Sequence, residues 1–517
     1  MENTIRVRLV VAGTLTAIAA AGAVVGGQPA SAKAAGAGHV QTSIKWGACP
    51  ELPQGAERDP RQTCGTVTVP LDYRRPDGET LSIAVSRIAT ATPGKRRGVL
   101  VFNPGGPGLQ GLDMPGRMAR TLPKDVLDSY DLIGFDPRGV GHSSPISCGL
   151  PDSALLTVFP YPGAGGSIEG NVATARATAE ACAKVGDRLR YFTSANSARD
   201  MDRIRQALGE RKISYWGQSF GTYLGAVYAS LFPRNTDRMV LEGNVDPTKV
   251  WAGMLNTWNQ GMDERFPDAA RVAAENHATL GLGRTVGKVT RSFLALADRL
   301  DREPAAVPGT QVVINGAVLR AITYQMLQQD ETLAPLTQFW KAAADLSAGK
   351  APTEEQLAVL RQIFADTPAT KGVPVDNQAT VIFSMLCGDT TWSSDVNSYA
   401  KAVAAARARH PLSAGMPNNV QPCAFWSQKP IEPLVKVTSH GPRNILILQN
   451  RRDNATPWAA ARGMRKALGD RAYFVGVEQG GHFAYGTGSA CADKTTATFL
   501  TKGILSAKDL TCAGRRS

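Results

Sequence analysis

The chain has 517 residues, of which 43% are hydrophobic and 20% are charged, a balance typical of globular proteins. This length favours two structural units, or one core with a large insertion. The net charge of +13 comes from Lys and Arg residues that are scattered without a long basic block, so we predict a basic solvated surface and no nucleic-acid partner.

The N-terminal segment has the pattern of an export signal. Two arginines precede the apolar, Ala-rich stretch Leu9 to Val25, and Ala30-Ser31-Ala32 provides a cleavage site. We therefore predict a signal peptide over residues 1–32 and a secreted, extracellular mature chain that starts near Lys33. An uncleaved anchor helix is the alternative. No later stretch is long and apolar enough to span a bilayer, so we expect no stable membrane anchor.

In chain order, short runs rich in β-branched and aromatic residues predict six strands in the first half. They cover residues 65–70, 80–86, 98–102, 130–135, 212–216 and 238–241. Apolar residues at helical spacing predict a helix at 197–209, which ends in a glycine. Alternation of strands and helices from about 98 to 242 indicates a parallel sheet with helices on both faces.

The second half of the chain begins with a different pattern. From about 248 to 435, Ala-rich helical stretches with several tryptophans replace the alternation. Strand patterns return at 444–449 and 473–477, so the end of the chain completes the sheet. We predict an α/β fold with a mostly parallel sheet and a large helical cap. The core is expected at 33–247 and 436–517, and the inserted cap at 248–435.

Eight cysteines are present, and an even number in an exported chain favours disulfides. Pairing of sequence neighbours closes short local loops, so we expect the pairs Cys49–Cys64, Cys148–Cys182, Cys387–Cys423 and Cys491–Cys512. The chain contains no C-x-x-C and no H-E-x-x-H pattern. We therefore predict no metal site and no cofactor.

The segment Gly217-Gln218-Ser219-Phe220-Gly221 follows a predicted strand and precedes a predicted helix. Gly-x-Ser-x-Gly in this context is a nucleophile elbow, a sharp turn that lifts the serine hydroxyl above the carboxyl edge of a sheet. The two glycines lack Cβ atoms, which lets strand and helix approach closely. We predict that Ser219 is a nucleophile.

A serine nucleophile needs a base and an acid. In this fold they follow the serine in the order Ser, acid, His, and the histidine lies on the loop after the final strand. His482 lies after the last predicted strand in a glycine-rich turn, and it alone among the histidines meets both conditions. Asp453 follows the strand at 444–449 and is the expected acid, with Asp246 as the alternative. The acid would orient His482 and stabilise the imidazolium ion.

An oxyanion hole needs two backbone N–H donors. The first is expected from Phe220 and the second from the loop 103–108. Within that loop we favour Gly105 or Gly106, because its prolines lack an N–H group. The same loop contains a competing pattern, since 106–111 matches G-x-G-x-x-G and Asp131 lies twenty residues further on. A dinucleotide-dependent oxidoreductase is therefore a remote alternative, although Pro107 lies in the turn that should donate to the pyrophosphate.

Three motifs resemble those of the secreted actinobacterial tripeptidyl aminopeptidases, which are α/β-hydrolase serine exopeptidases related to proline iminopeptidases. They are Asn103-Pro104-Gly105-Gly106-Pro107-Gly108, Gly134-Phe135-Asp136-Pro137-Arg138-Gly139-Val140-Gly141-His142-Ser143 and Gly217-Gln218-Ser219-Phe220-Gly221-Thr222-Tyr223-Leu224-Gly225. The resemblance extends over nearly the whole mature chain. It implies a Ser219–His482–Asp453 triad and the release of short peptides, often tripeptides, from a free N-terminus.

An exopeptidase of this kind must bind the ammonium group of its substrate, which calls for carboxylates between core and cap. Asp389 is the first candidate, because it lies between a cysteine and a tryptophan in an apolar stretch. Glu242 and Asp246 are further candidates, as are Asp263 and Glu264.

The same triad also suits other reactions. A carboxylesterase or lactone hydrolase is the main alternative, because the triad does not distinguish an amide from an ester. A non-catalytic binding module on a hydrolase scaffold is a remote alternative. The sequence contains no signal for an oligomeric state.

Overall fold

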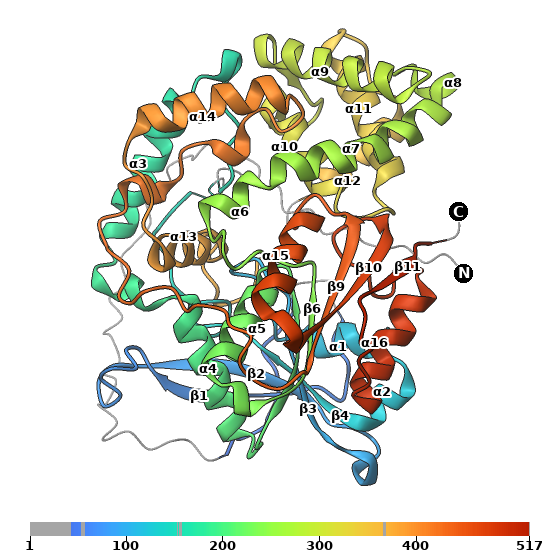
Figure 1. Ribbon diagram of the computed structural model, residues 1–517. Helices are drawn as coiled ribbons and strands as arrows, with labels where there is room; N and C mark the ends of the chain where they lie inside the picture. Colours follow the sequence, from blue (N-terminus) through green and yellow to red (C-terminus); the bar gives the residue numbers. More distant parts are fainter. Residues whose placement is uncertain (1–42, 53–56, 152–153, 155–157, 366–368, 516–517) are drawn as a thin grey trace.

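The computed structural model describes residues 43–52, 57–151, 154, 158–365 and 369–515. The predicted signal peptide at 1–32 lies outside the described residues. A nine-stranded sheet runs through the molecule (Figure 1) in the order β1-β2-β4-β3-β5-β6-β9-β10-β11. The strands are β1 Thr63–Pro70, β2 Thr80–Ile88, β3 Gly98–Asn103, β4 Tyr130–Phe135, β5 Ile213–Gln218, β6 Thr236–Glu242, β9 Ile445–Arg452, β10 Ala472–Gly480 and β11 Leu510–Ala513.

The pairing makes the sheet mostly parallel, as predicted. β2 is antiparallel to β1 and β4, and all pairs from β4 to β11 are parallel. β11 was not predicted from the sequence. It has four residues and only Cys512 among them is buried, so it lacks the apolar pattern of the inner strands.

Helices cover both faces of the sheet, and this explains why every residue of β3 and β4 is buried. Along β3, Val99 and Val101 pack on one face and Leu100 and Phe102 on the other. The first face carries α4 Ser194–Ala207, α5 Phe220–Leu231 and α15 Trp458–Leu468; the second carries α1 Met114–Ala119, α2 Lys124–Ser129 and α16 Ala490–Lys502.

The predicted helix at 197–209 is α4, which begins three residues earlier. Thr193 caps it, because its side chain accepts a hydrogen bond from the N–H of Asn196 at 3.2 Å.

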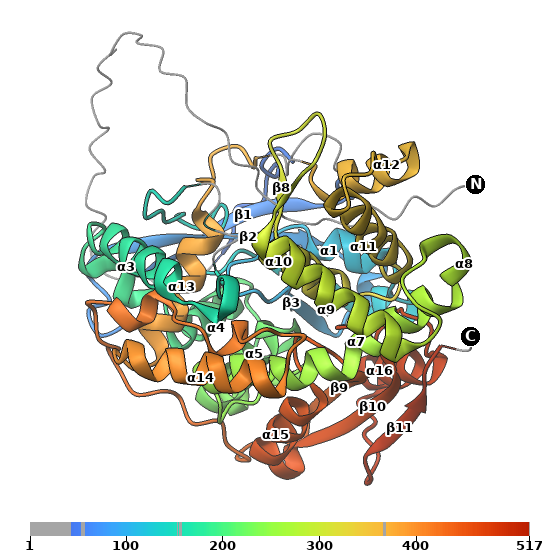
Figure 2. The same ribbon diagram turned by 90° about the horizontal axis from the view of Figure 1, so that it is seen from above.

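Between β6 and β9 the regular elements of the described chain are almost all helices, joined by long loops. Its elements are α6 Ala252–Asn256, α7 Trp258–Glu275, α8 His277–Leu280, α9 Val286–Arg302, the short hairpin β7 Ala305–Ala306 and β8 Val313–Ile314, α10 Gly316–Met326, α11 Leu333–Ser347, α12 Glu354–Ile363, α13 Asn377–Asp389 and α14 Val396–Arg409. Figures 1 and 2 show α7, α9, α10 and α14 over the sheet, on the side to which β9 and β10 point. A further helix, α3 Glu169–Ala183, lies beside α13 and α14.

The cap has its own hydrophobic core. The rings of Phe266, Phe293 and Trp340 pack against one another with centroids 4.9 to 5.2 Å apart. α13 is an exception among these helices, because its apolar side chains belong to the core beneath it. The division into 33–247, 248–435 and 436–517 stays a proposal, with α13 as the part of the cap most closely joined to the core.

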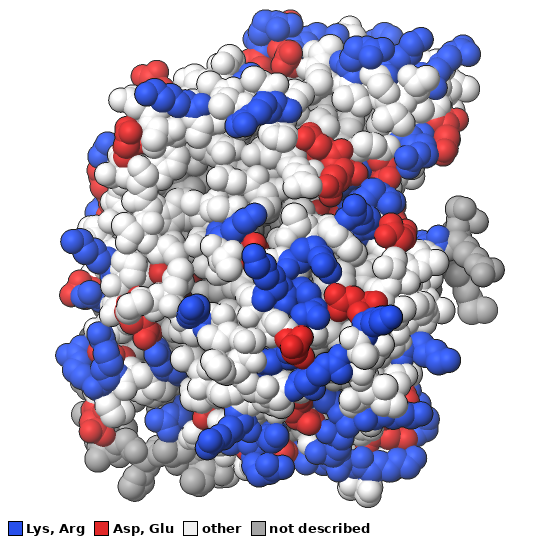
Figure 3. Space-filling view, in the orientation of Figure 1, with Lys and Arg blue, Asp and Glu red and all other residues white. Residues whose placement is uncertain are grey.

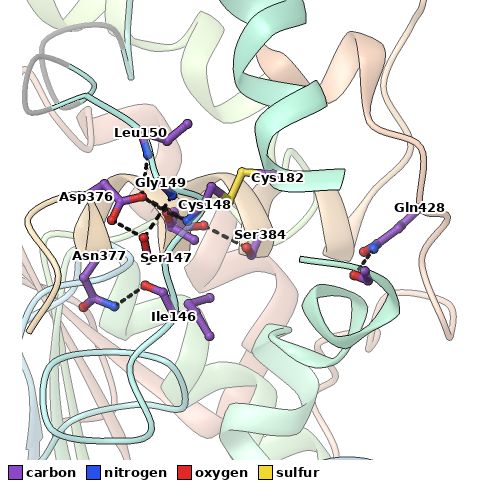
Figure 4. Close-up of a disulfide and its surroundings, with 12 residues drawn as sticks. Ile146, Ser147, Cys148, Gly149, Leu150, Cys182, Asp376, Asn377, Ser384 and Gln428 are labelled. Carbon is purple, nitrogen blue, oxygen red and sulfur yellow. Dashed lines mark hydrogen bonds between the residues drawn. A yellow bond between two sulfur atoms is a disulfide. The ribbon is translucent and has the colours of Figure 1, made fainter. Parts of the chain in front are cut away.

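The four predicted disulfides are confirmed: Cys49–Cys64, Cys148–Cys182, Cys387–Cys423 and Cys491–Cys512. Figure 4 shows the second of these. Each closes a loop of 15 to 36 residues, and loops of this size stabilise a fold by roughly 3 kcal/mol each.

On the face drawn in Figure 3, Lys and Arg side chains extend from the upper to the lower margin, with groups of Asp and Glu between them. Within the described ranges, no helix has the length and hydropathy needed to cross a membrane.

Candidate active site

Ser219 lies at the turn between β5 and α5 with φ 55° and ψ −124°. A positive φ at a residue other than glycine costs about 1–3 kcal/mol and is typical of functional turns. Two sets of contacts hold the turn. The N–H of Ser219 donates to the carbonyl of Glu242 at 2.9 Å, and the carbonyl of Ser219 accepts from the N–H and Oγ1 of Thr222 at 2.9 and 2.7 Å.

The two glycines of the elbow are required by close approach. A Cβ atom on Gly217 would lie 2.3 Å from the carbonyl oxygen of Gly221. A Cβ atom on Gly221 would lie 2.7 Å from Oδ1 of Asn103, at the end of β3. Either side chain would push the strand, the helix or the neighbouring loop out of place.

His482 and Asp453 form a buried pair. Nδ1 of His482 lies 2.9 Å from Oδ2 of Asp453, and the two residues are 5% and 0% exposed. Because the carboxylate accepts, Nδ1 carries the proton and Nε2 remains the basic nitrogen. The alternative acid, Asp246, binds the N–H and hydroxyl of Thr248 instead.

The Asp453 carboxylate is fixed by neighbours that sequence reasoning missed. Its Oδ1 accepts from the N–H groups of Ala455 and Thr456 at 2.8 and 2.9 Å. Its Oδ2 accepts from Oγ1 of Thr456 at 2.7 Å and from Nε2 of Gln449 at 3.2 Å. The contact between Thr456 and Asp453 does have a sequence signal, which is an Asp followed three residues later by Thr in a turn-like segment.

The imidazole of His482 lies against the main chain that follows β6. A Cβ atom on Gly243 would be 3.1 Å from Cε1 and 3.2 Å from Nδ1 of His482. Gly243 directly follows Glu242, whose carbonyl binds the N–H of Ser219. The serine, the acid and the histidine follow β5, β9 and β10, with β6 between the first two of these strands. All three therefore lie at the same carboxyl edge of the sheet, the arrangement expected for the predicted triad.

The loop after β3 packs on the elbow. A Cβ atom on Gly105 would lie 2.9 Å from Cβ of Ser219 and 3.2 Å from N of Phe220. Gly105 donates its own N–H to Oδ1 of Asn103 at 3.0 Å. Phe220 is the first residue of α5, where an N–H has no acceptor within the helix. The N–H of Gly106 has no acceptor among the described residues, whereas that of Gly105 has one, so Phe220 and Gly106 stay the candidates for the oxyanion donors.

The cap contacts both catalytic loops. The N–H of His482 donates to the carbonyl of Gln328, after α10, at 2.7 Å. Arg265 of α7 is 1% exposed, and its guanidinium binds Asp268 at 2.6 Å. Arg452, which directly precedes Asp453, binds the same carboxylate at 2.8 Å. These cap residues were not identified from the sequence, because their contacts join distant segments.

The carboxylates predicted to bind a substrate amine contact the protein itself. Asp389 accepts from the N–H and hydroxyl of Ser194 and from the indole of Trp251. Glu242 is fully buried and accepts four hydrogen bonds. Asp246 is 4% exposed. On α7, Asp263 lies 2.5 Å from Nδ1 of His410 and Glu264 accepts from Gln260. Amine binding by any of them stays a prediction.

The buried carboxyl group of Asp389 predicts a pH-dependent stability. Burial raises its pKa from 3.8 to about 6, against the opposing hydrogen bonds from Ser194 and Trp251. The unfolded chain releases this proton near pH 3.8 and the folded protein near pH 6. Stability therefore falls as the pH rises between these values, by roughly 3 kcal/mol at most. We expect Asp389→Asn to reduce the loss of unfolding free energy between about pH 4 and about pH 7, measured by urea denaturation.

The matched control is Asp395→Asn, which removes an exposed carboxylate near the start of α14. Its pH dependence should parallel that of the wild-type protein. If the curve of Asp389→Asn is also parallel to wild type, Asp389 does not carry the pH dependence.

Together, the elbow, the buried His–Asp pair and the sheet topology define an α/β hydrolase with the active-site arrangement of a serine hydrolase. A family profile described as the alpha/beta hydrolase fold matches residues 98–489. The chain is 33% identical over 461 residues to a tripeptidyl aminopeptidase of Streptomyces lividans, covering 87% of this chain and 83% of that protein. The chain belongs to the tripeptidyl aminopeptidase family within the α/β hydrolases, so the predicted resemblance is confirmed.

Two further relatives are named for different activities, one as a protease and the other as an esterase. The serine protease Hip1 of Mycobacterium tuberculosis is 27% identical over 474 residues, which cover 85% of each chain. Carboxylesterase B of Mycobacterium tuberculosis is 28% identical over 503 residues, covering 94% of this chain and 93% of that protein. The protein is thus an enzyme of the serine hydrolase class, which overturns the oxidoreductase and non-catalytic alternatives.

Proposed function

We propose that this enzyme is a secreted exopeptidase that releases short peptides, principally tripeptides, from the free N-termini of its substrates. The observation that carries the proposal is the buried Asp453–His482 pair beside the elbow at Ser219. The similarity to a tripeptidyl aminopeptidase over 87% of the chain supports the substrate class. The four disulfides support export, with residues 1–32 as the proposed signal peptide.

The proposed reaction follows from the hydrogen-bond pattern. Ser219 Oγ attacks the scissile carbonyl while Nε2 of His482 takes its proton, and Asp453 stabilises the imidazolium ion. The N–H groups of Phe220 and Gly106 bind the resulting oxyanion, and each such donor lowers the barrier by roughly 3–4 kcal/mol. His482 then protonates the leaving amine. Water attacks the acyl-enzyme by the reverse path and restores Ser219.

Recognition of a free N-terminus requires a carboxylate within reach of the acyl portion of the substrate. Asp263 and Glu264 of α7 are only partly buried, and this accessibility supports them as ligands of the ammonium group. Asp389 and Asp246 stay proposals, with their internal hydrogen bonds as the argument against them. The four internal hydrogen bonds of Glu242 favour a different role for that residue.

An esterase is the second candidate, because carboxylesterase B is similar over nearly the entire chain. Three chromogenic substrates separate the two functions: a tripeptide anilide with a free N-terminus, the same peptide N-acetylated, and a short-chain nitrophenyl ester. We expect the free peptide to exceed the blocked one in kcat/KM by at least about tenfold, since one lost charged contact costs about 1.4 kcal/mol or more. Ester turnover without release of peptide would establish the esterase instead.

A further inference from the structure

Glu242 is the last residue of β6, and its side chain joins the elbow to the histidine loop. Oε2 accepts from Nε1 of Trp216 at 3.0 Å and from Nε2 of Gln218 at 2.9 Å, both on β5. Oε1 accepts from the backbone N–H groups of Ala484 and Tyr485 at 2.9 and 2.8 Å. The residue is 0% exposed. One buried carboxylate therefore bonds to the residue before the nucleophile and to the two residues that follow Phe483.

The main chain at the same position makes two more contacts with the catalytic residues. The carbonyl of Glu242 accepts the N–H of Ser219 at 2.9 Å. The next residue, Gly243, lies beneath the imidazole, where an added Cβ would be 3.1 Å from Cε1 of His482. The rings of Trp216 and Tyr485 meet edge to face with centroids 4.8 Å apart. The end of β6 thus contacts both the nucleophile residue and the histidine.

The chemistry of the side chain suits this position. A carboxylate accepts up to about four hydrogen bonds and donates none, and four donors converge on it here. A carboxamide of the same size would replace one acceptor oxygen by an N–H₂ group that faces two N–H donors. Either the two side-chain donors of β5 or the N–H groups of Ala484 and Tyr485 would then lose their acceptor. Buried polar groups left without partners are costly.

We propose that Glu242 is a positioning residue that sets the distance between Ser219 and His482 by holding the histidine loop against the elbow. This role replaces, for Glu242, the amine-binding role predicted from the sequence. It deepens the proposed catalytic function and rests on it. A displacement of about 1 Å between reacting groups slows an enzymatic step by up to roughly 100-fold, while groups that bind substrate without reacting are unaffected.

The test measures the rate at which a fluorophosphonate probe labels Ser219 in the purified full chain, because this readout is independent of substrate class. The first control is that the wild-type protein is labelled and that Ser219→Ala is not, which shows that Ser219 is reactive. A wild-type protein that is not labelled would refute the proposed function itself. We then expect Glu242→Gln to label roughly 10- to 100-fold more slowly than wild type. On a substrate that the wild-type enzyme hydrolyses, the kcat of Glu242→Gln should fall by a similar factor, while its KM stays within about threefold of the wild-type KM.

Asp376→Asn is the matched control, because Asp376 is also buried and also accepts four hydrogen bonds. Its donors are Ser147 and the N–H groups of Cys148 and Leu150, which Figure 4 shows, together with the hydroxyl of Thr380. None of these belongs to the elbow or to the loops of the acid and the histidine. We expect a lower melting temperature and labelling within about threefold of wild type.

A third variant, Glu242→Asp, retains the charge but is one methylene shorter and reaches fewer of the four donors. Intermediate labelling rates would support the positioning role, and this variant decides the matter if Glu242→Gln is not folded. Wild-type labelling by either folded Glu242 variant overturns the proposal. Equal slowing in Asp376→Asn at a matched melting temperature also overturns it, because the effect would then follow from general destabilisation.

Discussion

Ser219→Ala is expected to lower kcat by roughly 10⁴-fold or more on every substrate that the wild-type enzyme hydrolyses. The reason is that the serine oxygen forms the acyl-enzyme bond, and without it His482 has no hydroxyl proton to accept and no nucleophile to activate. Alanine keeps the Cβ atom at φ 55°, so the strain of the elbow is unchanged and the melting temperature should remain close to that of the wild type. Steady-state kinetics with thermal melting of the same preparation checks both expectations.

Ser230→Ala is a suitable control for this variant. Ser230 lies on α5, the helix that starts at the elbow, and its hydroxyl donates to the carbonyl of Ala226. Its removal should leave kcat within about twofold of the wild type. Residual hydrolysis by Ser219→Ala above about one part in a hundred would contradict the assignment of Ser219 as the nucleophile.

Asp453→Asn is expected to lower kcat by roughly 10³- to 10⁴-fold with a much smaller change in KM. The Asn amide can donate to Nδ1 of His482, which favours the tautomer whose Nε2 carries the proton and no longer acts as a base. The hydrogen bonds from Ala455 and Thr456 to Oδ1 favour the same side-chain position, while the new amide group replaces the oxygen that accepts from Thr456 Oγ1 and Gln449 Nε2. Pre-steady-state acylation of Ser219 by an activated ester measures the affected step directly.

The comparison variant is Asp246→Asn, which changes the acid at the end of the preceding strand. We expect a far smaller loss of acylation rate, because Asp246 contacts Thr248 and not His482. A larger loss in Asp246→Asn than in Asp453→Asn would reverse the assignment of the acid.

The predictions that agree best with the structure depend on short-range patterns. Gly217 and Gly221 mark the elbow, and alternating or continuous apolar runs mark the strands. The contacts around Glu242 show the limit of such patterns. Glu242 and Ala484 are 242 residues apart, and a single glutamate at the end of a strand has the same local pattern whether it binds a substrate or bridges two loops. β11 shows a second limit, since its four residues bury one side chain.

The sequence by itself determined eight of the nine strands of the large sheet, the nucleophile elbow, and the acid and histidine expected to act with Ser219. These follow from local backbone preferences, side-chain periodicity and the fixed chain order of a parallel sheet with its crossovers. Only the tertiary structure decided which carboxylates already accept hydrogen bonds from the protein itself. It also decided that Gly105 donates to Asn103 and that the cap binds the loop of His482. The physical reason is that a hydrogen bond between remote segments depends on where folding brings their backbones, and no local pattern contains that information.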